Sequence, residues 1–289
     1  MSTKKSVLIT GASSGFGRLT AEAFAADGWR VFGTMRNING ANAAAAAALR
    51  ASGVDVIELD VTSDSSVDTA AATIASEVGT LDVLVNNAGT AFFGIQEAFT
   101  PQAVERQYAT NVIGPLRVNR AFLPAMRERR SGLVIYVSSV VGRIVFPFGG
   151  VYASSKWALE ALAQASSYEL APFDVDVAIV EPGAYPTEII GKIGLNDDLA
   201  RVSSYGAEVA RYAAGATARI AERAQGQDPA DVARVILRLA NAPAGTRPFR
   251  SVTPANPLVE AINAAVEPLQ RVAVESLGID AILPKVPVS

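Results

Sequence analysis

The sequence of 289 residues contains no cysteine and no histidine. Without cysteine the chain has no disulfide framework, no thiolate nucleophile and no cysteine-ligated metal site. Without histidine it has no Ser-His-Asp triad, no imidazole acid or base and no histidine-ligated zinc. Any catalysis must therefore use tyrosine, lysine, serine, asparagine or carboxylate side chains, and we expect no bound metal.

A strong charge of either sign is also missing, since 25 Lys and Arg residues stand against 28 Asp and Glu residues, a net charge of −3. Nucleic-acid-binding domains are usually basic, so we expect no nucleic-acid partner. Lys4 and Lys5 precede only a short apolar run, and the longest charge-free run, 83–96, is shorter than the roughly 18 residues of a membrane span. We therefore expect a cytoplasmic protein without a signal peptide or a membrane span.

Short apolar runs alternate with longer stretches of helical character along most of the chain. The apolar runs lie at 6–10, 30–34, 54–59, 81–85, 133–137 and 175–180, and the helical stretches at 18–27, 41–52, 65–78, 101–129 and 152–171. Each run is almost continuously apolar, which is typical of parallel strands buried on both faces. Alternating strands and helices favour right-handed crossovers, so we predict an α/β fold with a doubly wound parallel sheet of the Rossmann type.

No linker rich in proline, glycine or serine interrupts the chain before about residue 240, so we predict one domain over 1–240. Within it, 186–226 lacks strand signals and becomes amphipathic with scattered glycines, which is typical of a lid over a substrate site. From Asn241 the chain is rich in proline and then becomes helical around 258–276. We therefore predict a C-terminal helical extension over 241–289.

The first predicted strand ends in a loop rich in glycine, and a helix begins directly after it. The loop reads Thr10-Gly11-Ala12-Ser13-Ser14-Gly15-Phe16-Gly17. Gly11 permits a tight turn, Gly15 allows the backbone close to a pyrophosphate, and Gly17 lets the helix approach the strand. The helix N-terminus offers free N–H groups and the positive end of its dipole to phosphates. The loop therefore predicts a dinucleotide site.

Further motifs follow the glycine loop along the chain. They are Asn86-Asn87-Ala88-Gly89 after the fourth predicted strand, Asn111, Ser139 with the Tyr152-Ala153-Ser154-Ser155-Lys156 motif, and Pro182-Gly183 followed by Thr187. Together with the loop they resemble the motifs of the short-chain dehydrogenase/reductase family, in the same order. The resemblance implies hydride transfer between a nicotinamide cofactor and a carbonyl or alcohol carbon.

The resemblance also implies roles for four residues at the reaction centre. Tyr152 is implied to be the general acid or base, and Ser139 to hold the substrate oxygen. Lys156 is implied to bind the nicotinamide ribose, and Asn111 to position a water molecule. A free tyrosine has a pKa near 10, too high for efficient base catalysis at neutral pH. We expect Lys156 and the positive charge of an oxidised nicotinamide to lower the pKa of Tyr152.

The end of the second predicted strand, Met35-Arg36, indicates which dinucleotide binds. An NAD-type enzyme is expected to carry a carboxylate there for the ribose hydroxyls, whereas Arg36 suits the 2′-phosphate of NADP. We favour NADP over NAD; the alternative is that Arg36 is a solvated surface residue. The residues predicted to contact the cofactor are Gly11, Ser13, Ser14, Gly15, Phe16, Gly17, Arg36, Asp60, Val61, Asn87, Ala88, Gly89, Tyr152, Lys156, Pro182, Gly183 and Thr187.

Large apolar side chains cluster in the segments expected to surround the substrate. Those predicted to line its pocket are Phe92, Phe93, Ile144, Phe146, Phe148, Tyr185 and Ile189. With few charges among them, an apolar ketone or alcohol fits better than a sugar or an acid. The alternative is that several of these side chains only pack the loops against the core.

Two other functions use the same fold. An epimerase or dehydratase of the extended branch of the family usually has a different glycine spacing. A catalytically inactive NADP-sensing protein has no need of Asn111, Ser139, Tyr152 and Lys156, so we favour the oxidoreductase. By resemblance we also expect a homodimer or homotetramer, formed through the helical stretches 101–129 and 152–171.

Overall fold

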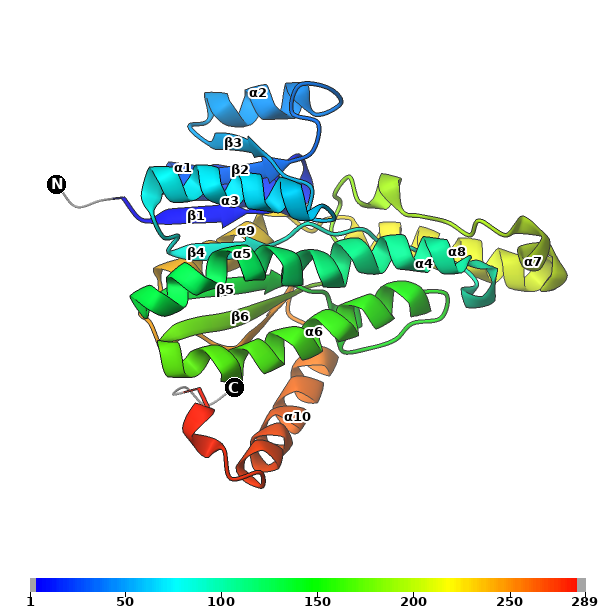
Figure 1. The fold of residues 1–289 in the computed structure, drawn as a ribbon. Helices are drawn as coiled ribbons and strands as arrows, with labels where there is room; N and C mark the ends of the chain where they lie inside the picture. The colour runs from blue at the N-terminus through cyan, green and yellow to red at the C-terminus, as the bar shows by residue number, and fades with distance from the viewer. Residues whose placement is uncertain (1–3, 285–289) are drawn as a thin grey trace.

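A parallel sheet of seven strands forms the centre of the molecule (Figure 1). The computed structural model describes residues 4–284. The strands are β1 (Ser6–Ile9), β2 (Arg30–Met35), β3 (Asp55–Glu58), β4 (Val83–Asn86), β5 (Gly132–Val137), β6 (Val175–Pro182) and β7 (Arg250–Thr253). Their order is β3-β2-β1-β4-β5-β6-β7, and every neighbouring pair is parallel. The predicted doubly wound α/β fold of the Rossmann type is confirmed.

Helices cover both faces of the sheet. One face packs against α1 (Gly15–Ala26), α2 (Ala43–Ala51) and α9 (Ala230–Asn241), and the other against α3 (Asp64–Val78), α5 (Gly114–Arg129) and α6 (Gly150–Leu170). Side chains of one strand alternate between the two cores: Val83 and Val85 lie in the first, and Leu84 lies in the second. This burial on both faces explains why the strands are continuously apolar in sequence.

The stretch 101–129 is not the single helix expected from the sequence. It consists of α4 (Pro101–Tyr108), a π-helical turn (Ala109–Ile113) and α5. Thr100 caps α4 by accepting a hydrogen bond from the N–H of Ala103 at 3.3 Å, and Pro101 fits the first turn because it has no N–H to satisfy. Such π-turns are frequent at functional sites, and this one contains Asn111.

The sheet extends beyond the domain boundary expected at residue 240. β7 pairs with β6 over four residues and forms one edge of the sheet. Its sequence, Arg-Ser-Val-Thr, contains no apolar run, so periodicity did not reveal it. After β7 the chain forms α10 (Pro257–Glu275), which lies near α6 at the lower end of the molecule in Figure 1. Part of the stretch predicted as an extension therefore belongs to the sheet.

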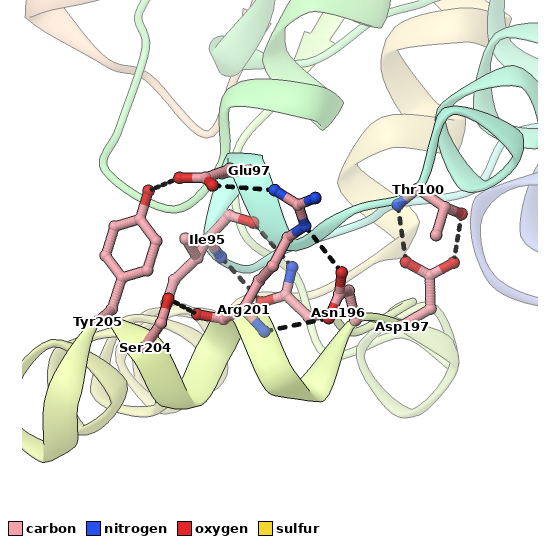
Figure 2. A network of polar contacts seen from close by, with 9 residues as sticks. Ile95, Glu97, Thr100, Asn196, Asp197, Arg201, Ser204 and Tyr205 are labelled. Atoms are coloured by element: carbon pink, nitrogen blue, oxygen red, sulfur yellow. Dashed lines mark hydrogen bonds and ion pairs between the residues drawn. The ribbon is translucent and has the colours of Figure 1, made fainter.

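The segment 186–226 leaves the sheet and is largely helical. It contains a short 3₁₀ turn (Ile190–Lys192), α7 (Leu199–Ser204) and α8 (Gly206–Ala224), with α7 at the far right of Figure 1. Polar contacts tie it to the loop between β4 and α4 (Figure 2). They join Glu97 to Arg201 and Tyr205, Thr100 to Asp197, and Ile95 to Asn196. None of the helices in residues 4–284 combines the length and hydropathy that a membrane span requires.

Candidate active site

The glycine loop between β1 and α1 leaves no space for side chains at two positions. A Cβ atom added to Gly11 would lie 2.8 Å from Cα of Ala88, and Gly11 also has a positive φ of 69°. A Cβ atom added to Gly17 would lie 2.4 Å from the carbonyl oxygen of Gly11. Gly11 is therefore needed for the turn and Gly17 for the close approach of α1 to the loop, as the sequence predicted.

The Asn-Asn-Ala-Gly motif fastens this loop to the end of β4. The Asn87 amide donates hydrogen bonds to the carbonyl oxygens of Thr10 at 2.8 Å and of Gly11 at 3.2 Å. The Thr10 hydroxyl accepts the backbone N–H groups of Asn87 and Ala88, both at 3.0 Å. The preceding Asn86 turns the other way and donates to Asn119 at 2.9 Å. These contacts hold the loop open at the carboxyl ends of β1 and β4, where ligands bind in such sheets.

A cleft of about 490 Å³ runs along this edge, from the glycine loop to α6. Most residues predicted to contact a cofactor line it: Gly11, Ser13, Ser14, Gly15, Phe16, Arg36, Asp60, Val61, Asn87, Ala88, Gly89, Tyr152, Lys156 and Thr187. Gly17 is not among its lining residues, and Pro182 and Gly183 line a neighbouring cavity instead. The cleft is also lined by residues that the sequence did not single out, among them Met35, Asn42, Thr62, Thr90, Arg106, Thr110, Ser138 and Lys192.

Tyr152 and Lys156 line the end of the cleft at α6, and Ser139, which forms a hydrogen bond with Tyr152, lines the neighbouring cavity. The Lys156 ammonium lies 5.9 Å from the centroid of the Tyr152 ring and donates a hydrogen bond to the carbonyl oxygen of Val137 at 2.9 Å. Tyr152 and Lys156 are four residues apart on α6, so their side chains share one helix face. The Ser139 hydroxyl, at the end of β5, donates to the carbonyl oxygen of Pro182 at 3.2 Å.

A second cavity of about 690 Å³ opens on the other side of Tyr152 and is mainly apolar. Five of the residues predicted to contact the substrate line it: Phe93, Phe146, Phe148, Tyr185 and Ile189. Two others do not line it: Phe92 faces the first cleft and stacks on Phe99, and Ile144 lines neither cavity. Further lining residues come from α8, which lies within the predicted lid 186–226, and from the loop after β7. The sequence did not single them out individually: Tyr212, Ala216, Arg219, Ile220, Arg223, Pro254, Ala255 and Asn256.

The family model described as short chain dehydrogenase matches residues 5–198 of the chain. The chain belongs to this family. The match includes the glycine loop, the reaction centre and Thr187, so it covers the motifs on which the resemblance was based.

Several relatives of this short-chain dehydrogenase are named as dehydrogenases or reductases. It is 39% identical to a 3-ketodihydrosphingosine reductase of Bacteroides thetaiotaomicron over 63% of this chain, but spans only 64% of that relative. It is 35% identical to human retinol dehydrogenase 8 over 84% of this chain and 79% of that one. A solved short-chain dehydrogenase from Streptomyces avermitilis is 33% identical, covers 96% of both chains and has a TM-score of 0.77. The chain is therefore a nicotinamide-dependent oxidoreductase.

The residues of the first cleft fit the nicotinamide dinucleotide that the family uses. Gly11 and Gly17 carry no side chain, and at both positions a Cβ atom would clash with nearby backbone atoms. The N-terminus of α1 opens on the cleft at Gly15 and Phe16, which suits a pyrophosphate. The opposite end of the cleft reaches Lys156, so one continuous space leads from a phosphate site to the reaction centre.

The protein's own groups do not lower the pKa of Tyr152 in this short-chain dehydrogenase. Burial raises the pKa of Tyr152 to about 12, although a hydrogen bond with Ser139 acts in the opposite direction. Burial also lowers the pKa of Lys156 to about 8, while the charge of Glu160 acts to raise it. Without a cofactor charge, the phenol is therefore a weaker acid than free tyrosine.

Asn111 lies in the π-turn with its amide fully engaged. Its Oδ1 accepts the N–H of Thr90 at 2.9 Å, and its Nδ2 donates to the carbonyl oxygen of Thr90 at 2.8 Å and to the Ser155 hydroxyl at 3.0 Å. A Cβ atom added to Gly89 would lie 3.5 Å from Oδ1 of Asn111 and 3.7 Å from Nζ of Lys156. Asn111 therefore braces the loop after β4 against α6, directly beside Lys156.

Proposed function

We propose that this chain is an NADP-dependent oxidoreductase that interconverts a carbonyl and an alcohol on a mostly apolar small molecule, with Tyr152 as the general acid or base. One observation carries the proposal: Tyr152 lines both the cofactor cleft and the apolar cavity. A group at this junction can exchange a proton with a substrate held next to a nicotinamide, as acid–base catalysis requires.

Residues of this chain carry out the proton transfer to and from the substrate oxygen. A bound nicotinamide supplies the hydride for reduction or accepts it in oxidation. With its pKa raised to about 12, Tyr152 is protonated at neutral pH and donates its proton to the oxygen of a carbonyl that is being reduced. The Ser139 hydroxyl turns from the carbonyl oxygen of Pro182 to donate its one hydrogen bond to the same substrate oxygen. The nearby Lys156 ammonium stabilises the phenolate that remains. In oxidation the phenolate takes the proton back from the alcohol.

Arg36 supports NADP as the cofactor. It is exposed at the carboxyl end of β2 and lines the cofactor cleft. The nearest strand partner of Met35 is Glu58 on β3, whose carboxylate accepts the backbone N–H of Asn37 at 3.2 Å. Glu58 is not among the described lining residues of the cleft, whereas Arg36 is, so a guanidinium is the charge available to the 2′-position of the ribose.

The apolar cavity supports a substrate with a large hydrocarbon portion. Phe93, Phe146 and Phe148 line it close to Tyr152, and the ring centroids of Phe93 and Tyr152 are 5.5 Å apart. Retinol and ketodihydrosphingosine, named in two of the relatives, are both largely apolar molecules. The same class of substrate is proposed for this chain.

The experiment that tests the proposed chemistry is the change Tyr152→Phe. Among the described residues Tyr152 is the only tyrosine that lines both cavities. Its loss removes the proton donor, so we expect kcat for a carbonyl substrate to fall about 10²- to 10⁴-fold, with NADPH binding by fluorescence titration little changed. The matched control is Tyr168→Phe, also on α6, because that phenol accepts a hydrogen bond from Gln164 and lines neither cavity.

Two results would contradict the proposal. Near-normal turnover by the Tyr152→Phe variant would exclude Tyr152 as the acid. NADPH binding without reduction of any compound in a broad panel of apolar carbonyls would favour an NADP-sensing protein instead.

We also propose a homodimer or homotetramer formed through α5 and α6. Three large apolar side chains are exposed around these helices: Ile113 at 45%, Leu116 at 48% and Trp157 at 46%. Side chains of this kind are enriched where subunits meet. The molar mass from light scattering tests the assembly, and the mass of a single chain would contradict it.

A further inference from the structure

Two arginines stand in the wall of the otherwise apolar cavity beside Tyr152. Arg219 and Arg223 of α8 both line it, whereas no aspartate, glutamate or lysine is among its described lining residues. The cavity that is proposed to hold the substrate therefore carries two positive charges and no negative one.

The position of these arginines follows from the geometry of α8. The residues of α8 that line the cavity are Tyr212, Ala216, Arg219, Ile220 and Arg223. Relative to Tyr212 the others stand at positions +4, +7, +8 and +11, which lie on one face of a helix. Arg211 lies outside this stripe and instead places its guanidinium over the ring of Tyr212, 4.9 Å from the centroid. Arg219 and Arg223 thus belong to the face that α8 presents to the cavity.

The two guanidinium groups also lack protein partners. Within residues 4–284 neither Arg219 nor Arg223 forms a hydrogen bond or an ion pair. Arginines of the neighbouring helices are paired: Arg201 of α7 contacts Asp198 and Glu97, and Arg234 of α9 contacts Asp228 and Asp231. The charges in the cavity wall are therefore not neutralised by the protein.

A cavity of this kind favours an amphipathic anion. Arg219 and Arg223 are solvent-exposed, so they line the cavity where it meets water. Two positive charges without a negative neighbour in the lining attract a negative group there, although water and salt screen the attraction. Guanidinium groups also hold carboxylates and phosphates with paired hydrogen bonds. A neutral apolar substrate would gain nothing from either charge.

We propose that the substrate is an apolar carbonyl compound with a terminal anionic group, of which a carboxylate is the simplest case, and that Arg219 and Arg223 bind that group. This assignment rests on the proposed function, because it concerns the substrate of the same site. It revises the expectation from sequence that an acid would fit poorly. The anionic group takes no part in the reaction: its role is to fix which end of the substrate reaches Tyr152.

The test compares a long-chain keto acid with its methyl ester, which differs only in charge at the terminus. We expect wild-type protein to prefer the acid, and the double variant Arg219→Gln/Arg223→Gln to lower kcat/KM for the acid about 10- to 100-fold, mainly through KM. Turnover of the ester should stay within about twofold. Raising the ionic strength should weaken the preference of the wild type for the acid. Arg211→Gln is the matched control, with no change expected for either compound.

Equal kcat/KM values for acid and ester in the wild type would overturn the inference. An equal loss for both compounds in the double variant would overturn it too, since the arginines would then only shape the wall with their apolar stems. A binding measurement separates this inference from the proposed function. Calorimetry with dodecanoate, dodecyl phosphate and methyl dodecanoate on the NADPH-loaded protein reports anion binding without turnover. Binding of either anion that is lost in the double variant supports the anion site at Arg219 and Arg223 even if no carbonyl is reduced. The anion that binds more tightly, dodecanoate or dodecyl phosphate, identifies the anionic group.

Discussion

At the scale of single residues, the pKa values of the groups at the reaction centre are set largely by the surroundings of each group. Burial raises the pKa of Tyr152 to about 12 and lowers the pKa of Lys156 to about 8, because it penalises the charged form of both side chains. Each is therefore driven towards its neutral form when the protein stands alone. A positive charge added by an oxidised nicotinamide would act together with Lys156 to favour the phenolate form of Tyr152.

The proposed preference for NADP depends on one residue, Arg36. A charge-assisted contact with the 2′-phosphate is worth a factor of about 10 to 100, so Arg36→Gln should lower kcat/KM for NADPH by that factor. The value for NADH should change little, since NADH carries no phosphate at that position. Parallel assays with the two cofactors check this, with Arg50→Gln on the exposed end of α2 as the control. A wild-type preference for NADH would contradict the assignment.

At the scale of elements, the segment after β6 contacts the glycine loop directly. The Glu188 carboxylate accepts the backbone N–H of Gly15 at 3.0 Å, and the Lys192 ammonium lies 3.4 Å from the Ser14 hydroxyl. The N–H of Gly15 belongs to the helix terminus that suits a pyrophosphate. Glu188 therefore holds a carboxylate where the cofactor is expected to place a phosphate.

We predict that Glu188 competes with the cofactor for the loop. Glu188→Ala removes both the competing acceptor and its negative charge, so the Kd for NADPH should fall about two- to tenfold. Fluorescence titration measures this, and Glu222→Ala on exposed α8 serves as the control because Glu222 lines neither cavity. An unchanged or weaker affinity in Glu188→Ala would show that this contact does not oppose binding.

At the scale of the whole molecule, a buried polar cluster joins α10 to the edge of the sheet. Arg250 of β7 contacts Glu160 of α6 and Glu267 of α10, and lies 3.4 Å from Glu181 of β6. Asn263 of α10 donates a hydrogen bond to Glu181 at 2.7 Å. The loop between β7 and α10 lines the apolar cavity, so the cluster that anchors α10 also supports one wall of the substrate site.

This cluster makes stability depend on pH. Burial raises the pKa of Glu181 to about 8, and the charge of Glu160 acts in the same direction, while Asn263, Arg250 and Arg143 oppose it. Glu267, also buried here, has its pKa raised by burial. Because the pKa of Glu181 is higher in the folded than in the unfolded protein, its stabilising contribution is present at low pH. It is lost as the pH rises through about 8.

We therefore expect the free energy of unfolding to fall between about pH 5 and about pH 8 more steeply in the wild type than in Glu181→Gln. Glutamine keeps the shape of the protonated acid but does not titrate. Urea denaturation at several pH values measures the slopes, and Glu260→Gln on the exposed face of α10 is the matched control. Parallel slopes for wild type and Glu181→Gln would show that Glu181 does not titrate in this range.

The sequence by itself determined the glycine loop, the strands of the sheet interior and the order of the motifs. These features are encoded locally: Gly11 and Gly17 exclude side chains, and strands such as β4 and β5 are buried on both faces and so must be apolar throughout. The cofactor side of the site could be predicted for the same reason, since its residues follow the ends of recognisable strands.

Only the tertiary structure decided the rest. The edge strand β7 has no apolar run, and the π-turn at Asn111 leaves no mark in helical periodicity. The face of α8 that carries Arg219 and Arg223 becomes a cavity wall only because the aromatic loops and the chain after β7 lie around the same space. The absence of histidine and cysteine limited the chemistry to groups such as Tyr152, but burial and neighbouring charges, which depend on distant parts of the chain, decided how that phenol behaves.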